Sequence, residues 1–455
     1  MRIHFIGIGG IGVSALAKYY LKKGWEVSGC DLAQSEITDQ LKEMGAHIRI
    51  GKPEKNCVPA NTERIVYSPA VSKENLRIEN CLPAGDVPKG QKLKVPALSY
   101  PETLGELTKT HYTIAVSGTH GKSTTTSMIG LLLVKAGFDP TIIVGTKLKE
   151  LGDSNCRVGR GKYLVIEADE HFASFLNYWP TIIVLTTVEA DHLDYYKNLE
   201  NIIETFKKYV KHLPEDGWLV ANKDDKNISE IRSVADSSQT MLFSLKQREA
   251  EEIRKLMKIP GEHNVANALA ALSVARILKI PDVISMKALG EYRGSWRRFE
   301  VFNLKKPKPY TLVSDYGHHP TEIKVTVEAA KQKWPNKPIW LVFQPHQYQR
   351  TYLLWDDFVK VLSNLPVEKL ILTDIYDVAG REDKKLKAKV SSEKLVTAIE
   401  NCKLKIKNYP IIHIPTVQQA EQYIKKNVTG GEIVMVMGAG DIYNLTLSLT
   451  KSKIK

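Results

Sequence analysis

The sequence predicts an α/β protein of three consecutive domains, and three observations lead to this fold class. Short apolar stretches alternate with helix-forming stretches along the 455 residues, as in parallel sheets covered by helices. Two of the apolar stretches end in glycine-rich turns, at residues 7–12 and 118–123. The chain is also longer than one ordinary domain. We predict a Rossmann-like domain over residues 1–108, a central P-loop ATPase-type α/β domain over 109–297 and a Rossmann-like C-terminal α/β domain over 298–455.

The first domain opens with a dinucleotide-type glycine turn. A predicted strand over residues 2–8 leads into Gly7-Ile8-Gly9-Gly10-Ile11-Gly12, a helix follows over residues 13–23, and a second strand ends at Asp31. This spacing is typical of a βαβ unit that holds a pyrophosphate at the helix N-terminus. NAD and a UDP-sugar both carry that group, so the residues leave the ligand open. A further strand over residues 64–68 ends at Ser68, and residues 82–96 predict a surface loop.

The central domain is organised around a turn that resembles a P-loop. An apolar strand runs into Gly118-Thr119-His120-Gly121-Lys122-Ser123-Thr124, and helix-forming sequence follows. Backbone N–H groups in such a turn face an anion, the lysine reaches the terminal phosphates, and the serine hydroxyl ligates Mg²⁺. Val116 stands where the strict pattern has its first glycine, so a chance turn is the alternative. The order of strand, turn and helix favours a nucleoside triphosphate site.

Two later strands of the central domain end in acidic residues. The strand over residues 162–170 closes with Glu167-Ala168-Asp169-Glu170, and Glu189-Ala190-Asp191-His192 follows the strand over 181–187. Ligands of open α/β sheets lie beyond the carboxyl ends of the strands. Glu167 and His192 are therefore candidate ligands of a divalent cation beside the P-loop. Helix capping is the alternative role of such acids.

Further candidate binding residues lie at the start of a helix, at the second domain boundary and after two strands of the C-terminal domain. Asn264 has the paired donor and acceptor that suit an adenine edge, or it caps a helix. Arg298, in an arginine pair, is a candidate phosphate clamp or a solvated surface residue. Asp315 is a candidate acceptor for ribose hydroxyls, with capping and a turn as the alternative for its motif. His346 and Arg350 are candidates to hold a carboxylate. Strands of this domain are predicted at residues 310–314, 338–343, 368–374, 410–414 and 432–437.

Composition narrows the class of partner. The formal charge is +13, but the lysines are spread out and form no basic stripe with aromatic residues, which favours small phosphorylated substrates over nucleic acid. The cysteines are odd in number and show neither metal-type spacing nor a disulfide framework, so a reducing cytoplasm is expected. We also expect no signal peptide and no membrane association. The cysteines are Cys30, Cys57, Cys81, Cys156 and Cys402.

Taken together, the motifs resemble the Mur ligase family, whose members form amide bonds with ATP in peptidoglycan synthesis. The motifs occur in family order and span nearly the whole chain. They are Gly118-Thr119-His120-Gly121-Lys122-Ser123, Glu167-Ala168-Asp169-Glu170, Glu189-Ala190-Asp191-His192, Gly261-Glu262-His263-Asn264, Arg297-Arg298-Phe299 and Asp315-Tyr316-Gly317-His318-His319-Pro320-Thr321. The Gly7–Gly12 loop, Phe343-Gln344-Pro345-His346 and Gly438-Ala439-Gly440-Asp441 most resemble the members that act on UDP-N-acetylmuramate and L-alanine.

The resemblance implies that ATP phosphorylates the lactyl carboxylate of UDP-N-acetylmuramate, and that the amine of L-alanine then displaces phosphate from the acyl phosphate. It implies Lys122, Glu167, His192, His346 and Arg350 as catalytic residues and ATP with Mg²⁺ as cofactors. Mg²⁺ would be held by Ser123, Glu167 and His192, and the UDP-sugar by Gly9, Gly10, Gly12, Asp31 and Ser68. ATP would be bound by Gly118, Thr119, His120, Gly121, Lys122, Ser123, Thr124, Asn264, Arg298 and Asp315.

The chain departs from the family pattern in two places. After Glu170 the family usually has Ser-Asp, and here His171 and Phe172 follow, which removes a carboxylate near the implied metal. Few residues separate Asn222 from Gly261, where relatives carry extra strands. Three alternatives stay open: a relative that joins another amino acid or a peptide to the same UDP-sugar, an NAD-dependent oxidoreductase, and a nucleotide-binding regulator without turnover.

Overall fold

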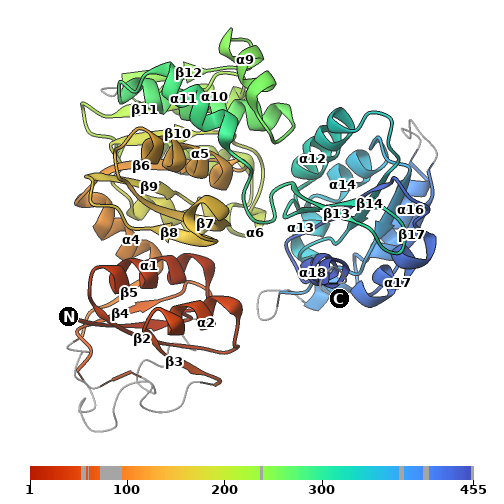
Figure 1. Ribbon diagram of the computed structural model, residues 1–455, viewed down its shortest axis with the longest axis horizontal. Coiled ribbons are helices and arrows are strands. Elements are labelled where there is room, and N and C mark those ends of the chain that lie inside the picture. Colours follow the sequence, from red (N-terminus) through yellow and green to blue (C-terminus); the bar gives the residue numbers. More distant parts are fainter. Residues whose placement is uncertain are drawn as a thin grey trace. The chain divides into compact units, whose positions relative to one another are not determined.

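The computed structural model describes residues 1–52, 58–59, 61–71, 95–235, 239–378, 384–402 and 409–451. The surface loop predicted at 82–96 lies outside them, apart from its last two residues. The chain divides into two compact units. Unit 1 contains residues 1–188, 203–243 and 270–288, and unit 2 contains residues 189–202, 244–269 and 289–455. The elements are labelled in Figure 1.

The first sheet is parallel, and its order is β3-β2-β1-β4-β5. The chain leaves β1 toward β2 on one side and returns to β4 on the other, so the strand order switches at the carboxyl end of β1, where the Gly7 turn begins. The strands are β1 (Arg2–Ile6), β2 (Glu26–Asp31), β3 (His47–Ile50), β4 (Arg64–Tyr67) and β5 (Ala97–Ser99); the described helices are α1 (Ile11–Lys22), α2 (Glu36–Glu43) and α4 (Tyr100–Lys109).

The second sheet has the order β12-β11-β10-β6-β9-β7-β8, and all of its pairs are parallel except β7 with β8. Strand β6 lies between β9 and β10, so the turns that follow these three strands meet at one edge of the sheet. The strands are β6 (Tyr112–Ser117), β7 (Thr141–Leu148), β8 (Ser154–Arg157), β9 (Tyr163–Glu167), β10 (Ile182–Leu185), β11 (Trp218–Asn222) and β12 (Gln239–Phe243).

The helices between residues 122 and 291 follow from local sequence signals. Helix α5 starts directly after Gly121, whose φ of 83° suits a residue without a Cβ. Asp225 caps α8 by accepting hydrogen bonds from the backbone N–H groups of Asn227 and Ile228. The helices are α5 (Lys122–Lys135), α6 (Leu193–Tyr196), α7 (Leu199–Val210), α8 (Lys226–Arg232), α9 (Glu249–Leu256), α10 (Glu262–Ile277) and α11 (Asp282–Glu291), with 3₁₀ segments at Lys149–Leu151 and His171–Asn177.

The third sheet lies in unit 2 and has the order β13-β14-β18-β15-β16-β17, with only β13 antiparallel to its neighbour. Apolar cores cover both faces, one centred on Val313 and Phe343 and the other on Val342 and Val434. The strands are β13 (Glu300–Leu304), β14 (Tyr310–Asp315), β15 (Ile339–Phe343), β16 (Lys369–Leu372), β17 (Ile411–His413) and β18 (Ile433–Met437). The helices are α12 (Pro320–Lys333), α13 (Tyr348–Leu353), α14 (Trp355–Leu362), α15 (Lys384–Lys387), α16 (Ser392–Glu400), α17 (Val417–Asn427) and α18 (Tyr443–Lys451).

Polar contacts join the first and second sheets within unit 1. The Asn155 side chain, on β8, donates from Nδ2 to the backbone oxygen of Ile11 at 2.5 Å and to Ser14 Oγ at 3.0 Å, both on α1. Its Oδ1 accepts from Nζ of the buried Lys18 at 2.9 Å. Buried polar groups must be paired, so these bonds fix α1 on the β7–β8 hairpin. Both glycine turns therefore belong to one compact body (Figure 1).

The predicted three-domain α/β class is confirmed, and the predicted strands and helices occur within a few residues of their expected ends. The strands β3, β5, β12 and β13 and the hairpin β7–β8 were not predicted. The three sheets fall within residues 2–99, 112–243 and 300–437; the boundaries near 108 and 297 stay predictions. Within the described ranges, no helix combines the length and apolar character needed to span a bilayer.

Candidate active site

The P-loop turn is pinned to the residues that follow β10. Thr119 N donates to the Thr187 backbone oxygen at 2.7 Å, and His120 N donates to Thr187 Oγ1 at 3.1 Å. Thr186 Oγ1 donates to the His120 backbone oxygen at 2.5 Å. Gly118 has φ of 132°, and a Cβ there would lie 2.2 Å from Thr186 Oγ1. The two threonines thus set the shape of the turn, and only glycine fits at 118.

Lys122 is the first residue of α5, and its ammonium group turns back over the P-loop. Nζ donates to the backbone oxygens of Gly118 at 2.6 Å and Thr119 at 3.2 Å, and to Glu170 Oε2 at 2.9 Å. Burial alone would lower the pKa of Lys122, but the carboxylates of Glu170 and Asp169 raise it above its usual value. Lys122 therefore stays charged at neutral pH, as a phosphate-binding lysine must.

Glu167 ends β9 beside the P-loop strand. Its Oε1 accepts a hydrogen bond from Gly145 N at 2.7 Å, and a Cβ on Gly145 would lie 2.9 Å from Oε2. The backbone thus orients the carboxylate. Ser123, next to Lys122, is buried in the first turn of α5. A hydroxyl and a carboxylate are hard oxygen donors, so these two residues fit Mg²⁺ chemically.

His192 belongs to unit 2, whereas Glu167 belongs to unit 1. The joint metal set of Ser123, Glu167 and His192 therefore stays a prediction. His192 itself has φ of 51°, a left-handed conformation that non-glycine residues rarely adopt. Its backbone N donates to its neighbour Asp191 Oδ1 at 2.7 Å. The left-handed backbone at His192 sets the direction in which its side chain leaves the chain. Strained backbone conformations of this kind are common at functional sites.

His171 and Phe172 form an aromatic pair at the start of the 3₁₀ segment. Their rings stack with centroids 4.0 Å apart, and Phe172 has φ of 54°. Its side chain is 47% exposed, so the pair is not a core contact. The resemblance implies a carboxylate at this place, and the structure has a stacked ring there.

The N-terminal glycine turn is braced by Asp31, which ends β2. Gly9 N donates to Asp31 Oδ2 at 2.8 Å, and Gly7 N donates to the backbone oxygen of Cys30 at 2.9 Å. Gly7 has φ of 76°, and a Cβ there would lie 3.0 Å from Ser68 Cβ. The structure thus brings Gly9, Asp31 and Ser68 around one turn at the switch point of the first sheet.

The other two glycines of this motif have different surroundings. Gly10 precedes α1 and takes the N-cap position. A Cβ on Gly12 would lie 2.8 Å from the ring of Tyr100, so Gly12 allows α1 to pack against α4. Packing gives Gly12 a structural role, and the predicted ligand roles of Gly9, Gly10 and Gly12 stay untested.

Asn264 lies in the first turn of α10, in unit 2. The capping alternative is wrong, because α10 begins at Glu262 and Asn264 lies inside it. Its Nδ2 donates to the Pro260 backbone oxygen at 2.6 Å, and the side chain is buried rather than a surface group. Oδ1 and the second N–H of the amide are the groups that an adenine edge would use.

The paired arginines differ from each other, and the solvated alternative is wrong for Arg297. Its guanidinium is buried, lies 4.6 Å from the Tyr443 ring centroid and 4.9 Å from that of Tyr316, and donates from Nη2 to the Gly438 backbone oxygen at 2.6 Å. Arg298 is only partly buried and lies 3.8 Å from Glu322. Arg298 is therefore the arginine of the pair that keeps access to a phosphate.

Asp315 ends β14, and each of its carboxylate oxygens accepts one hydrogen bond from the backbone. Oδ1 accepts from Gly317 N at 2.7 Å and Oδ2 accepts from Phe299 N at 2.8 Å. Burial raises the pKa of this carboxyl. Each oxygen keeps one further acceptor site for a ribose hydroxyl. The capping alternative is confirmed for the neighbouring His319, whose ring accepts from Thr321 N at the start of α12.

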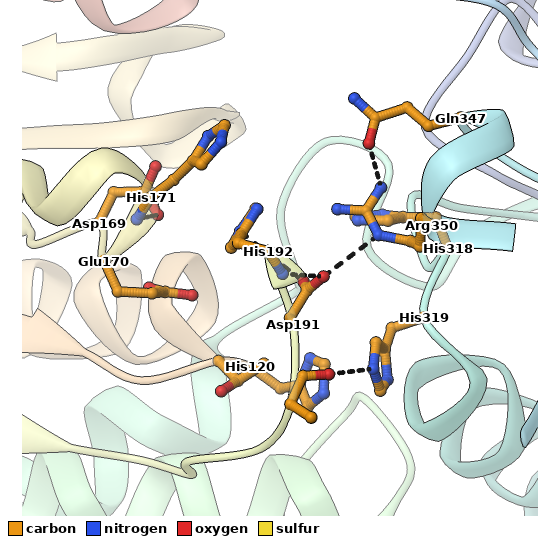
Figure 2. A network of polar contacts seen from close by, with 12 residues as sticks. His120, Asp169, Glu170, His171, Asp191, His192, His318, His319, Gln347 and Arg350 are labelled. Atoms are coloured by element: carbon orange, nitrogen blue, oxygen red, sulfur yellow. Dashed lines mark hydrogen bonds and ion pairs between the residues drawn. The ribbon is translucent and has the colours of Figure 1, made fainter. Parts of the chain in front are cut away.

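His346 and Arg350 lie together after β15, and Arg350 has a partner that the sequence did not reveal. Its Nη1 lies 3.3 Å from His346 Nδ1 and donates to Gln347 Oε1 at 3.2 Å. Its Nε donates to Asp191 Oδ1 at 3.2 Å, and both side chains of this ion pair are less than one-tenth exposed. Figure 2 shows Arg350 between Asp191 and Gln347.

Arg350 forms an ion pair with Asp191 and lies near two imidazole rings, those of His318 and His346. Burial alone would raise the pKa of Asp191, but Arg350 and His192 hold it well below its usual range. Burial lowers the pKa of His346 to about 3 and that of His318 to about 4. Both rings are therefore neutral at pH 7, and Arg350 supplies the local positive charge for a substrate carboxylate.

The structure thus gathers the P-loop, Lys122, Ser123 and Glu167 at one sheet edge, and His346 with Arg350 at another. Sequence reasoning gave no role to Thr186, Thr187, Glu170 or Asp191. All four follow the ends of β9 and β10, so their place beyond two central strands was the available signal.

Comparison with known proteins gives matches along nearly the whole chain. Three family models match in order: "Mur ligase family, catalytic domain" over residues 2–112, "Mur ligase middle domain" over 116–275 and "Mur ligase, glutamate ligase domain" over 297–440. The UDP-N-acetylmuramate–L-alanine ligase of Clostridium acetobutylicum is 38% identical over 98% of this chain and 96% of its own. That of Clostridium tetani is 39% identical over 97% and 96%.

A solved structure supports the same architecture. The UDP-N-acetylmuramate–alanine ligase of Thermotoga maritima superposes with a TM-score of 0.76, covering 100% of this chain and 99% of that chain at 24% identity. At this level of identity the match supports the fold alone. The order of the three sheets along the chain is thus shared with a known enzyme architecture.

Proposed function

Because the chain belongs to the Mur ligase family, we propose that it joins L-alanine to UDP-N-acetylmuramate with ATP, in peptidoglycan precursor synthesis. The relatives that carry this activity by name align over at least 97% of the chain. The structural observation that carries the proposal is the braced P-loop with the charged Lys122 over it. We place the enzyme in the cytoplasm, acting on small molecules rather than nucleic acid.

The reaction has two steps. The lactyl carboxylate attacks the γ-phosphorus of ATP, the bond to the β-phosphate oxygen breaks, and ADP leaves with its electron pair. The amine of L-alanine then adds to the acyl phosphate, and the tetrahedral intermediate expels phosphate as the amide forms and the amine loses a proton. Such transfers need positioning and charge neutralisation more than covalent chemistry from the protein.

For the nucleotide, residues of the P-loop and residues of unit 2 supply the positioning and the charge neutralisation. Backbone N–H groups of the turn and Lys122 bind the phosphates, and the high pKa of Lys122 keeps its charge in place. Asn264 meets adenine, and Arg298 and Asp315 serve the phosphate and ribose side. Ser123, Glu167 and His192 would hold Mg²⁺, and the ion would supply charge neutralisation on the phosphates.

The other two substrates use the remaining motifs. The Gly9–Gly10 turn at the end of β1 binds the pyrophosphate of the UDP-sugar, with Asp31 and Ser68 beside it. Arg350 binds the carboxylate of L-alanine, and the neutral imidazole of His346 lies next to the Arg350 guanidinium. A guanidinium can hold a carboxylate through two parallel hydrogen bonds, which orients the amine as well as binding it.

The test is phosphate release from ATP and Mg²⁺ with UDP-N-acetylmuramate, measured with and without L-alanine, in the wild-type chain and Lys122→Ala. We expect release that requires both substrates and is lost in the variant. Replacing L-alanine by serine or glycine then measures specificity, which is worth roughly 10- to 200-fold for a change of one small group. Nucleotide binding without release would contradict the ligase and favour the regulator, and NAD-dependent turnover independent of Lys122 would favour the oxidoreductase.

A further inference from the structure

Residues 186–192, the strap segment, are hydrogen-bonded along their whole length. The segment begins at the P-loop, where Thr186 and Thr187 bind the backbone of residues 119 and 120. Val188 follows, with its N donating to Asp225 Oδ2 at 2.8 Å and its oxygen accepting from Asn227 Nδ2 at 2.7 Å. The first half of the strap segment is therefore fixed to the second sheet and to the start of α8.

The second half of the strap segment is fixed to the C-terminal domain within unit 2. Glu189 Oε2 accepts from Thr321 Oγ1 at 2.7 Å, and the backbone oxygen of Ala190 lies 3.2 Å from His319 Nε2. Asp191 then forms the buried ion pair with Arg350 (Figure 2). The side chains of Thr321 and His319 come from the start of α12, so the strap segment is anchored to the start of α12 and, through Arg350, to α13.

Asp191 holds Arg350 in one orientation. Asp191 Oδ1 also accepts from His192 N at 2.7 Å, so its carboxylate cannot turn away without breaking a second bond. On Arg350, Nε is taken by Asp191, and Nη1 by Gln347 and His346. Nη2 has no hydrogen-bond partner among the residues that the structure describes. Asp191, Gln347 and Arg350 line one small pocket. A guanidinium that is already fixed in place binds a carboxylate at a lower entropic cost than a mobile one.

We propose that Asp191 is a positioning residue that fixes Arg350 for the amino-acid carboxylate, and that the strap segment couples amino-acid binding at Arg350 to nucleotide binding at the P-loop. The inference rests on the proposed function, which supplies the two ligands. Between Thr187 and Asp191 the backbone spans four residue steps, each of at most about 3.6 Å. Continuous backbone of the strap segment thus links Asp191 to the threonines that shape the P-loop. Such coupling is reciprocal and typically amounts to roughly 5- to 150-fold in affinity.

The experiment uses the full-length chain and the variant Asp191→Asn, with UDP-N-acetylmuramate present throughout. Affinity for a non-hydrolysable ATP analogue is measured by calorimetry with and without L-alanine, and phosphate release gives KM and kcat. In the wild type, we expect L-alanine to tighten analogue binding at least about 5-fold. In Asp191→Asn, we expect the KM for L-alanine to rise roughly 30-fold or more, because truncating a buried charge pair is costly. kcat at saturating L-alanine should change little, and the effect of L-alanine on the analogue should vanish.

Two further variants separate positioning from general stability. Asp191→Glu restores the carboxylate and should recover part of the L-alanine affinity. Asp282→Asn removes the same charge from another Arg–Asp pair, with Arg276 at 2.7 Å on the surface of unit 1, and should behave as wild type. An Asp191→Asn enzyme with unchanged KM and coupling would overturn the inference. So would a loss of affinity for all substrates together with a lower unfolding temperature and no rescue by glutamate. A wild-type chain that releases no phosphate would instead contradict the proposed function.

Discussion

Replacing Gly118 by alanine tests whether the residues after β10 really shape the phosphate-binding turn. Gly118 has φ of 132°, and an added Cβ would lie 2.2 Å from Thr186 Oγ1 and 2.7 Å from the Thr187 backbone oxygen. Thr187 O also accepts the hydrogen bond from Thr119 N, so it cannot retreat without opening the turn. Alanine must therefore strain its own backbone and displace the two threonines.

The expected cost has two parts. A residue forced into such a backbone region costs about 1–3 kcal/mol. Displacing packed neighbours costs a further 1–3 kcal/mol or so. Gly137 provides the matched control: it follows the other end of α5 with φ of 81°, and nothing lies within 4 Å of its added Cβ. Gly137→Ala therefore carries only the backbone term, about 1 kcal/mol.

The assay combines thermal unfolding with calorimetric binding of a non-hydrolysable ATP analogue. For domains of this size, about 1 kcal/mol lowers Tm by roughly 2–4 °C. The Tm of Gly137→Ala should fall by that amount, and this variant should bind the analogue as the wild type does. The Tm of Gly118→Ala should fall further. Its affinity for the analogue should be at least about 10-fold lower, because the N–H groups of the turn move away from the phosphates. Equal Tm values for the two variants, with unchanged affinity in Gly118→Ala, would refute the reasoning.

Three further predictions concern single side chains. Lys122→Ala should abolish phosphate release and destabilise the chain by about 3 kcal/mol, because Glu170 loses the ammonium group 2.9 Å away. Adding Glu170→Gln should recover part of this stability, measured by denaturant titration. A double variant that is no more stable than Lys122→Ala would argue against the ion pair. Burial, with Arg49 nearby, lowers the pKa of His4 from 6.5 to about 4, so the unfolded chain binds more protons between these pH values and stability falls as pH drops through this range. His4→Gln should therefore lose about 2 kcal/mol less than wild type between pH 7 and pH 5, and parallel pH profiles would contradict the assignment. Chelation of Mg²⁺ should stop turnover, and Glu167→Gln should raise the Mg²⁺ concentration for half-maximal rate about 10-fold; an unshifted Mg²⁺ titration would remove Glu167 from the metal set.

The sequence by itself determined the features that depend on neighbouring residues. The turns at Gly7–Gly12 and Gly118–Ser123 were predictable because strand, glycines and helix follow one another within about 20 residues. The acids after β9 and β10 were predictable as candidates because strand ends carry the ligands of open sheets. The α/β class followed from the alternation of apolar strands with helices, and it is confirmed.

Only the tertiary structure decided which distant residues meet. Arg350 and Asp191 are 159 positions apart, and no local pattern pairs them. Asn155 reaches α1 across 144 positions to Ile11, and Arg297, one of two adjacent arginines, is the one buried against Tyr443. These contacts depend on strand order and on side-chain packing between segments far apart in the chain. Hydrophobic periodicity shows which face of a segment is buried, but not which other segment packs on that face. The hydrogen bonds and ion pairs that hold the site residues in place are therefore known only from the assembled sheets.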